Sequence, residues 1–295
     1  MSLLKKGDKI AIVSPSSCIE ANSLEDAVIW LKNNGFEVVL GKHVYSTNSY
    51  MAGTDIERAD DVNKAFADTS VKAVFCSRGG AGSAKILNHL DFDLIEKNPK
   101  PIFGLSDSTA LQNALYKKTG NISFSGFLPV YDFKEKHLDE KIQKSIQSIF
   151  AGKSQTIKSG KCINGGISDG ILIGGNLSVL CYLCGTQYFP NFENKILLLE
   201  DIGEKSYKID LMLNQLSQQK NFDKLKGIIF GHFTNCIEAN KGDGTVENII
   251  KNFAKTLNIP VICDFDYGHI KSRYVLPIGA NILLDATNSI IETRV

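Results

Sequence analysis

Short apolar runs alternate along this chain with segments of helical periodicity, and this alternation restricts the fold more than any other feature of the sequence. The first five runs have the length of buried strands and cover residues 10–14, 36–40, 71–76, 101–104 and 121–127. Apolar residues between the first two runs recur at helical spacing over residues 24–31. Repeated strand–helix–strand order predicts an α/β fold, with helices on both faces of a parallel sheet.

Two turns follow strands of this predicted sheet and contain residues suited to binding or catalysis. The glycine-rich turn Ser77-Arg78-Gly79-Gly80-Ala81-Gly82 follows the third strand, and Leu105-Ser106-Asp107-Ser108 follows the fourth. Ligands of open parallel sheets bind beyond the carboxyl ends of the strands. Both turns are therefore expected on the same rim of the sheet. Earlier in the chain, Thr54 and Glu57 form a candidate capping box at the start of a helix.

The second half of the chain predicts a further group of strands. Candidate strands cover residues 170–173, 195–199, 227–230 and 260–263, and residues 281–291 predict a hairpin with its turn at Ala286–Ser289. A polar, lysine-rich stretch separates the two halves. We therefore predict a first domain over residues 1–135, a connecting segment over 136–165 and a second domain over 166–295.

Charge and composition argue against several classes of partner. The chain has 295 residues, 33 of them basic and 32 acidic, and no basic run that would favour nucleic acid. No apolar run approaches the roughly 20 residues that span a bilayer, and the N-terminus lacks the order of a signal peptide. We expect a soluble, cytoplasmic protein with no membrane or nucleic-acid partner. The seven cysteines predict no disulfide framework, and Cys181 and Cys184 are read as packing residues of a buried helix.

Ser106 is the candidate nucleophile. A serine hydroxyl needs a base to take its proton and a geometry that exposes it. A sharp strand-to-helix turn such as Gly104-Leu105-Ser106-Asp107-Ser108 exposes the side chain and places helical N–H groups near a developing oxyanion. The alternative is structural, because Ser106 or Asp107 can simply cap the helix.

The glycine-rich turn is a candidate second source of oxyanion donors. Glycines allow the backbone to approach a ligand closely and to point N–H groups into a cavity. Its rivals are a phosphate-binding loop, which the glycine spacing supports weakly, and a purely structural turn.

The base and its orienting acid remain open on spacing alone. His43, His89 and His137 lie in polar or helical settings, whereas His232 and His269 each follow a strand. Glu200 and Asp201 end a strongly apolar strand, and successive strand residues point to opposite faces. Only one of these two carboxylates is therefore expected to reach a shared site.

Together these segments resemble the LD-carboxypeptidase family of serine peptidases, which includes murein tetrapeptide carboxypeptidases and microcin C immunity hydrolases. The matching stretches occur in the family's order and cover nearly the whole chain. They are Ile12-Val13-Ser14-Pro15-Ser16, Ser77-Arg78-Gly79-Gly80-Ala81-Gly82, Phe103-Gly104-Leu105-Ser106-Asp107, Gly174-Gly175-Asn176-Leu177, Leu199-Glu200-Asp201, Gly268-His269 and Leu276-Pro277-Ile278-Gly279.

The resemblance implies a catalytic triad of Ser106, Glu200 and His269. It implies oxyanion donors at the N–H groups of Asp107 and Gly80, with Gly79 or Ala81 as alternatives to Gly80. Family members often carry an aromatic residue where this chain has Ala81. Arg78 is a candidate partner for a substrate carboxylate.

The same resemblance implies the architecture and the reaction. It implies a flavodoxin-like N-terminal domain, a smaller β-rich α/β C-terminal domain, a homodimer, and neither metal nor cofactor. The expected reaction removes the terminal D-alanine of a murein tetrapeptide through an acyl-enzyme. One rival is hydrolysis of peptidyl or aminoacyl sulfamoyl-adenylates by the same triad. A rival from another class is a non-catalytic protein that binds an anion or a phosphorylated ligand.

Overall fold

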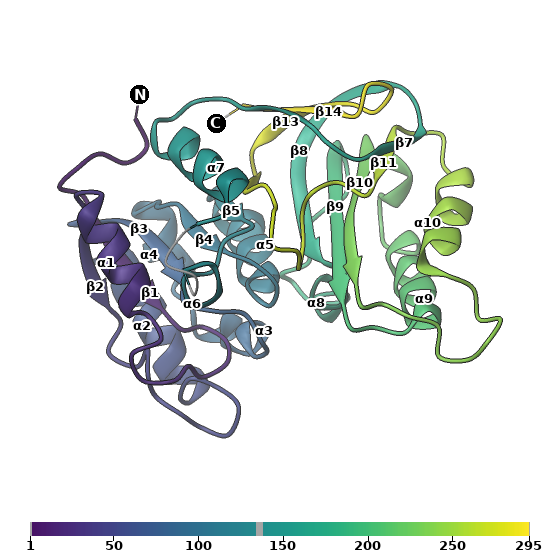
Figure 1. Ribbon diagram of the computed structural model, residues 1–295. Coiled ribbons are helices and arrows are strands. Elements are labelled where there is room, and N and C mark those ends of the chain that lie inside the picture. The colour runs from purple at the N-terminus through teal and green to yellow at the C-terminus, as the bar shows by residue number, and fades with distance from the viewer. Residues whose placement is uncertain (1, 134–137, 295) are drawn as a thin grey trace.

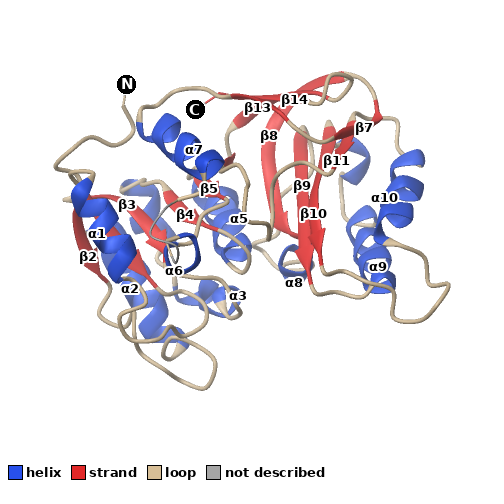
Figure 2. Cartoon of the chain, in the orientation of Figure 1, coloured by secondary structure: helices blue, strands red, loops and turns tan. Residues whose placement is uncertain are grey.

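The computed structural model describes residues 2–133 and 138–294, and it contains two sheets placed side by side, each with its own helices (Figures 1 and 2). The first sheet has six strands in the order β12-β5-β4-β3-β1-β2. Its strands are β1 (Lys9–Val13), β2 (Glu37–Leu40), β3 (Val71–Cys76), β4 (Ile102–Gly104), β5 (Ser123–Ser125) and β12 (Leu276–Ile278). Strands β1 to β5 are parallel, and β12 pairs antiparallel with β5.

Helices cover both faces of this sheet, as the alternating pattern predicts. Apolar side chains of α1 and α7 pack on one face, and those of α2 to α5 pack on the other. The helices of this half are α1 (Glu25–Asn33), α2 (Asp55–Ala67), α3 (Ser83–Ile86), η1 (Leu87–His89), α4 (Phe92–Lys97), α5 (Ser108–Thr119), α6 (Pro129–Asp132) and α7 (Glu140–Phe150). The strand order 2-1-3-4-5 is that of flavodoxin-like folds, so the predicted fold class is confirmed.

The second sheet has eight strands in the order β6-β14-β13-β8-β9-β10-β11-β7. Its strands are β6 (Thr156–Lys158), β7 (Lys161–Asn164), β8 (Ile167–Asn176), β9 (Lys195–Ile202), β10 (Gly227–Thr234), β11 (Val261–Cys263), β13 (Asn281–Asp285) and β14 (Ile290–Arg294). The middle strands β8 to β11 are parallel, and the flanking strands are antiparallel. Its helices are α8 (Leu177–Tyr182), α9 (Ser206–Ser217), η2 (Phe222–Lys224) and α10 (Val246–Lys255).

The two halves share structure at their seam. Strand β12 belongs to the second half of the chain but completes the first sheet, and α5 packs against β8 and α8 (Figure 1). The segment predicted as a connection contains β6 and β7, which are strands of the second sheet. The boundaries at residues 135 and 165 stay a prediction. The first turns of α5 meet the C-terminal end of β8 at this seam, where hydrogen bonds join Thr109 to Asn176 and Asn113 to Gly174.

Candidate active site

Ser106 lies in the tight turn between β4 and α5. Its φ angle is 66°, in the left-handed region that a non-glycine residue adopts at a cost. The turn lies against Gly79, where an added Cβ would sit 2.8 Å from the Cβ of Ser106. The strained backbone and the missing side chain at residue 79 together expose the serine hydroxyl at the end of β4.

Two backbone N–H groups near this turn remain available as donors: that of Asp107, next to Ser106 in the chain, and that of Gly80, which lines the same cavity as Ser106. Within the described chain, neither the N–H of Asp107 nor that of Gly80 donates to another group. The N–H of Ala81 donates to Ser17 Oγ at 3.0 Å, which leaves Ala81 a poor alternative. Gly80 has a φ of 110°, and an added Cβ there would lie 2.2 Å from Ser17 Oγ. A side chain at residue 80 would therefore displace the turn.

His269 and Glu200 come from the second half and form a tight pair. The Nδ1 atom of His269 lies 2.7 Å from Glu200 Oε2. Glu200 is 0% exposed and ends the apolar part of β9, whereas the His269 side chain is 19% exposed. A carboxylate beside Nδ1 favours the tautomer that carries its proton there, so Nε2 is left as the proton acceptor.

One pocket brings the two halves of the site together. Ser106, His269, Arg78, Gly79 and Gly80 all line a cavity of about 680 Å³ at the seam. Among the described residues, no hydrogen bond joins Ser106 Oγ to the His269 ring. Catalytic hydrogen bonds often tighten only once substrate is bound. The cavity has the size of a small-ligand site.

Asp201 and His232, the other candidates at strand ends, face different partners. Asp201 accepts hydrogen bonds from the N–H and hydroxyl of Ser178, at 3.0 and 2.6 Å, and burial raises its pKa. His232 Nε2 lies 3.6 Å from Asp266 and is not among the residues that line the cavity. The contacts therefore favour Glu200 over Asp201, and His269 over His232, as residues of the candidate site. His137 lies outside the described residues.

Arg78 supplies a cationic group to the cavity wall. Its guanidinium donates to the carbonyl of Cys18 at 2.9 Å and lies 5.6 Å from the ring centre of Tyr131. Within the described chain it forms no ion pair with a carboxylate. Arg273 also lines the cavity, but its guanidinium binds both oxygens of Asp132 at 2.6 and 2.7 Å. Arg78 is therefore the better placed of these two arginines for a substrate carboxylate.

Two family models match most of the chain. Residues 10–126 match the LD-carboxypeptidase N-terminal domain, and residues 169–284 match the LD-carboxypeptidase C-terminal domain. The chain belongs to the LD-carboxypeptidase family.

Relatives in this family include proteins named as carboxypeptidases and a protein named for microcin immunity. A probable murein peptide carboxypeptidase of Bacillus subtilis is 32% identical over 99% of this chain and 94% of its own length. The microcin C7 self-immunity protein of Escherichia coli is 28% identical over 98% of this chain and 94% of its own. The crystal structure of a muramoyltetrapeptide carboxypeptidase from Oxalobacter formigenes superposes with a TM-score of 0.88 at 29% identity, and the match covers 97% of each chain.

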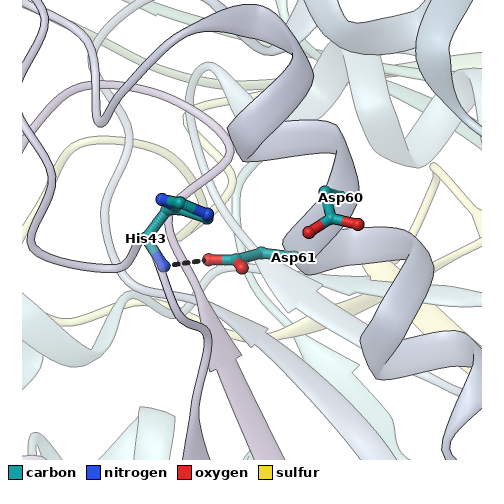
Figure 3. Close-up of side chains that lie close together, drawn as sticks. All are labelled: His43, Asp60 and Asp61. Atoms are coloured by element: carbon teal, nitrogen blue, oxygen red, sulfur yellow. Dashed lines mark hydrogen bonds between the residues drawn. The ribbon is translucent and has the colours of Figure 1, made fainter.

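One cluster outside the seam cavity has the residue types of a metal site. His43, Asp60 and Asp61 each offer an atom within 4.8 Å of the others (Figure 3). Asp61 accepts the backbone N–H of His43 at 2.8 Å, and Asp60 pairs with Lys64 at 2.5 Å. Asp61 thus anchors the loop after β2 to α2, and the carboxylate of Asp60 has a cationic partner within α2. It lines no part of the seam cavity.

Sequence reasoning missed the polar residues that hold the site in place. Asn176 and Thr109 are buried and hydrogen-bonded across the seam, and Arg273 and Asp132 form a buried pair at the cavity wall. Asn176 precedes a helical stretch, so its capping role could be inferred from the sequence, but its long-range contacts could not. In the described part of the chain, no helix combines the length and apolar character needed to cross a bilayer.

Proposed function

We propose that this chain is a serine carboxypeptidase that hydrolyses the L,D-amide bond before the terminal D-alanine of murein tetrapeptides. One observation carries the proposal: a single cavity is lined both by the strained Ser106 and by His269, whose ring is backed by the buried Glu200. These residues lie far apart in the sequence. Membership of a carboxypeptidase family and relatives named for murein peptides support the same reaction.

The geometry supports a two-step acyl transfer. His269 Nε2 takes the Ser106 proton as the hydroxyl oxygen bonds to the amide carbon, and Glu200 stabilises the resulting imidazolium. The N–H groups of Asp107 and Gly80 bind the oxyanion of the tetrahedral intermediate. The imidazolium then protonates the amine of D-alanine as the C–N bond breaks. Water, activated by His269, hydrolyses the acyl-enzyme and restores the Ser106 hydroxyl.

Arg78 gives a reason for carboxypeptidase action at this cavity. A free C-terminal carboxylate distinguishes the last residue of a peptide from all others. An arginine binds a carboxylate through two parallel N–H groups. Arg78 has no carboxylate partner in the described chain. In this proposal its guanidinium therefore binds the carboxylate of the departing D-alanine.

The test measures D-alanine released from a purified murein tetrapeptide, with a fluorophosphonate probe to locate the nucleophile. Wild-type protein is expected to release D-alanine and to carry the probe on Ser106 by peptide mass spectrometry, and Ser106→Ala is expected to do neither. Ser108→Ala is a matched control, because Ser108 begins α5 only two residues after Ser106 but lies outside the residues that line the cavity. Probe labelling without D-alanine release would contradict the substrate and leave the serine chemistry standing.

A second candidate function rests on the relative named as a microcin C7 self-immunity protein. The same serine chemistry would hydrolyse an aminoacyl sulfamoyl-adenosine, and the cavity of about 680 Å³ is large enough for such a ligand. Incubation with that compound distinguishes the two substrates. Equal binding of one phosphorylated ligand by wild type and Ser106→Ala, with no hydrolysis by either, would instead favour a non-catalytic binding protein.

A further inference from the structure

Asn176 lies at the seam where the two halves of the site meet. It is the last residue of β8 and the N-cap of α8, and it is buried. Its side-chain Oδ1 accepts the N–H of Val179 at 3.1 Å. Its Nδ2 donates to Glu200 Oε1 at 3.1 Å and to Asp201 Oδ1 at 3.0 Å. These partners fix the orientation of the carboxamide, because Nδ2 alone can donate to carboxylate oxygens.

The contact with Glu200 completes the surroundings of a fully buried carboxylate. One oxygen of Glu200 faces His269 and the other faces Asn176. A buried charge is costly unless hydrogen bonds and an opposite charge compensate it. Asn176 therefore fixes the rotamer of Glu200 from the side opposite the histidine ring.

The backbone of Asn176 reaches the nucleophile half of the molecule. Its N–H donates to Thr109 Oγ1 at 2.9 Å, and the N–H of Thr109 donates to the carbonyl of Ser106 at 2.9 Å. Gly175 allows this approach, since an added Cβ there would lie 2.5 Å from Thr109 Oγ1. A continuous set of hydrogen bonds thus runs from the backbone of Ser106 to Glu200.

We infer that Asn176 is a positioning residue. It holds Glu200, and through it His269, in the correct position relative to the turn of Ser106 across the seam. This inference rests on the proposed function, because it assigns Glu200 the role of orienting His269. Asn176 itself does not line the cavity among the described residues, so it acts through Glu200 and not on the substrate.

The test compares Asn176→Ser with Asn113→Ser. Serine also caps helices well, so α8 keeps its N-cap while the donors to Glu200 and Asp201 are lost. Asn113 is a matched control: it is buried in α5 and exchanges hydrogen bonds with Gly174 across the same seam, both at 2.9 Å, but does not contact Glu200. Unfolding in urea, kcat and KM are measured for each variant.

Misplacement of a catalytic group costs on the order of 100-fold in rate. We expect Asn176→Ser to lower kcat by about 10- to 100-fold with KM unchanged, and Asn113→Ser to lower stability while its kcat stays near that of wild type. In a Glu200→Gln background, Asn176→Ser is expected to have no further effect on kcat. Equal losses of kcat in both asparagine variants, or an unchanged kcat in Asn176→Ser, would overturn the inference.

The rate of fluorophosphonate labelling of Ser106 separates this inference from the proposed substrate. Labelling needs the positioned triad but no peptide. The inference is supported, even when no D-alanine is released, if Asn176→Ser is labelled more slowly than wild type and Asn113→Ser is labelled at the wild-type rate. Wild-type protein that fails to label and fails to release D-alanine overturns the triad and this inference together.

Discussion

At the scale of single residues, the close approach of Gly79 to Ser106 is the feature that exposes the candidate nucleophile. An added Cβ at residue 79 would lie 2.8 Å from the Cβ of Ser106 and 3.1 Å from its Oγ. Because the turn also contains the left-handed φ of Ser106, it has little freedom to yield. The exact placement of the hydroxyl thus depends on a residue that has no side chain.

We predict that Gly79→Ala lowers kcat for D-alanine release by about 100-fold, through displacement of the serine hydroxyl. Overpacking is expected to lower the free energy of unfolding by about 1–3 kcal/mol. Gly165→Ala is the control, since an added Cβ there contacts only the Thr287 hydroxyl, at 3.1 Å. Wild-type activity in Gly79→Ala would show that the turn relaxes easily.

Asp201 gives a prediction about pH. Burial raises the pKa of Asp201 above its usual 3.8, so between pH 4 and the raised value the folded chain binds more protons at this residue than the unfolded chain. Stability from this group is therefore lost as the pH rises through that window. An asparagine at residue 201 does not titrate. The free energy of unfolding, measured by urea denaturation from pH 4 to 7, is therefore expected to fall less steeply with pH in Asp201→Asn than in wild type. The same pH dependence of the free energy of unfolding in Asp201→Asn and wild type would contradict this account.

At the scale of elements, α2 begins at a capping box that the sequence predicts and the structure contains. Thr54 Oγ1 accepts the N–H of Glu57 at 3.3 Å, and Glu57 Oε2 accepts the N–H of Thr54 at 2.8 Å. We predict that Thr54→Ala lowers the free energy of unfolding by about 1 kcal/mol. Thr54→Ser is expected to keep most of the stabilisation that the cap provides. Urea denaturation measures both, and equal stability of the alanine variant and wild type would contradict the role of the cap.

Elements with a strong local pattern could be predicted from the sequence, and elements that depend on distant partners could not. The parallel strands of the first sheet and the hairpin of β13 and β14 lie where apolar runs and turn residues place them. Strand β12 was not predicted, because it has three residues with a proline in the middle. Proline is tolerated there because β12 lies at the edge of its sheet.

In the candidate site, too, local features could be predicted from the sequence and long-range contacts could not. A serine in a strand-to-helix turn and carboxylates at a strand end could be recognised locally. The choice of Glu200 over Asp201, and of His269 over His232, depends on contacts between residues far apart in the chain, and spacing alone left both open. The roles of Ser106, Glu200, His269 and the oxyanion donors remain a proposal that mutagenesis must test.

At the scale of the whole molecule, the two halves are tied together by more than the chain connection. Strand β12 completes the first sheet, Lys141 pairs with Asp266 at 2.6 Å, and Arg273 binds Asp132. The pairing of β12 with β5 joins the two matched family regions, and the two ion pairs join α6 and α7 of the first half to the second half. The halves are therefore expected to unfold as one unit. The expected homodimer stays a prediction.

The single tryptophan offers a direct check of this cooperativity. Trp30 lies in α1 and packs against the core of the first half. We predict that its fluorescence and the far-ultraviolet circular dichroism of the whole chain follow coincident urea transitions. A fluorescence transition clearly separated from the dichroism transition would show that the first half unfolds independently.

The central claim is that Ser106 and His269, contributed by different halves of the chain, act as one catalytic unit at the seam. The most direct measurement compares kcat/KM for D-alanine release in Ser106→Ala, His269→Ala and the double variant, with folding checked by circular dichroism. Groups that act as a unit are strongly non-additive, so each single variant is expected to lose nearly all activity and the double variant to lose no more. Near wild-type activity in His269→Ala, or losses that multiply in the double variant, would contradict the account.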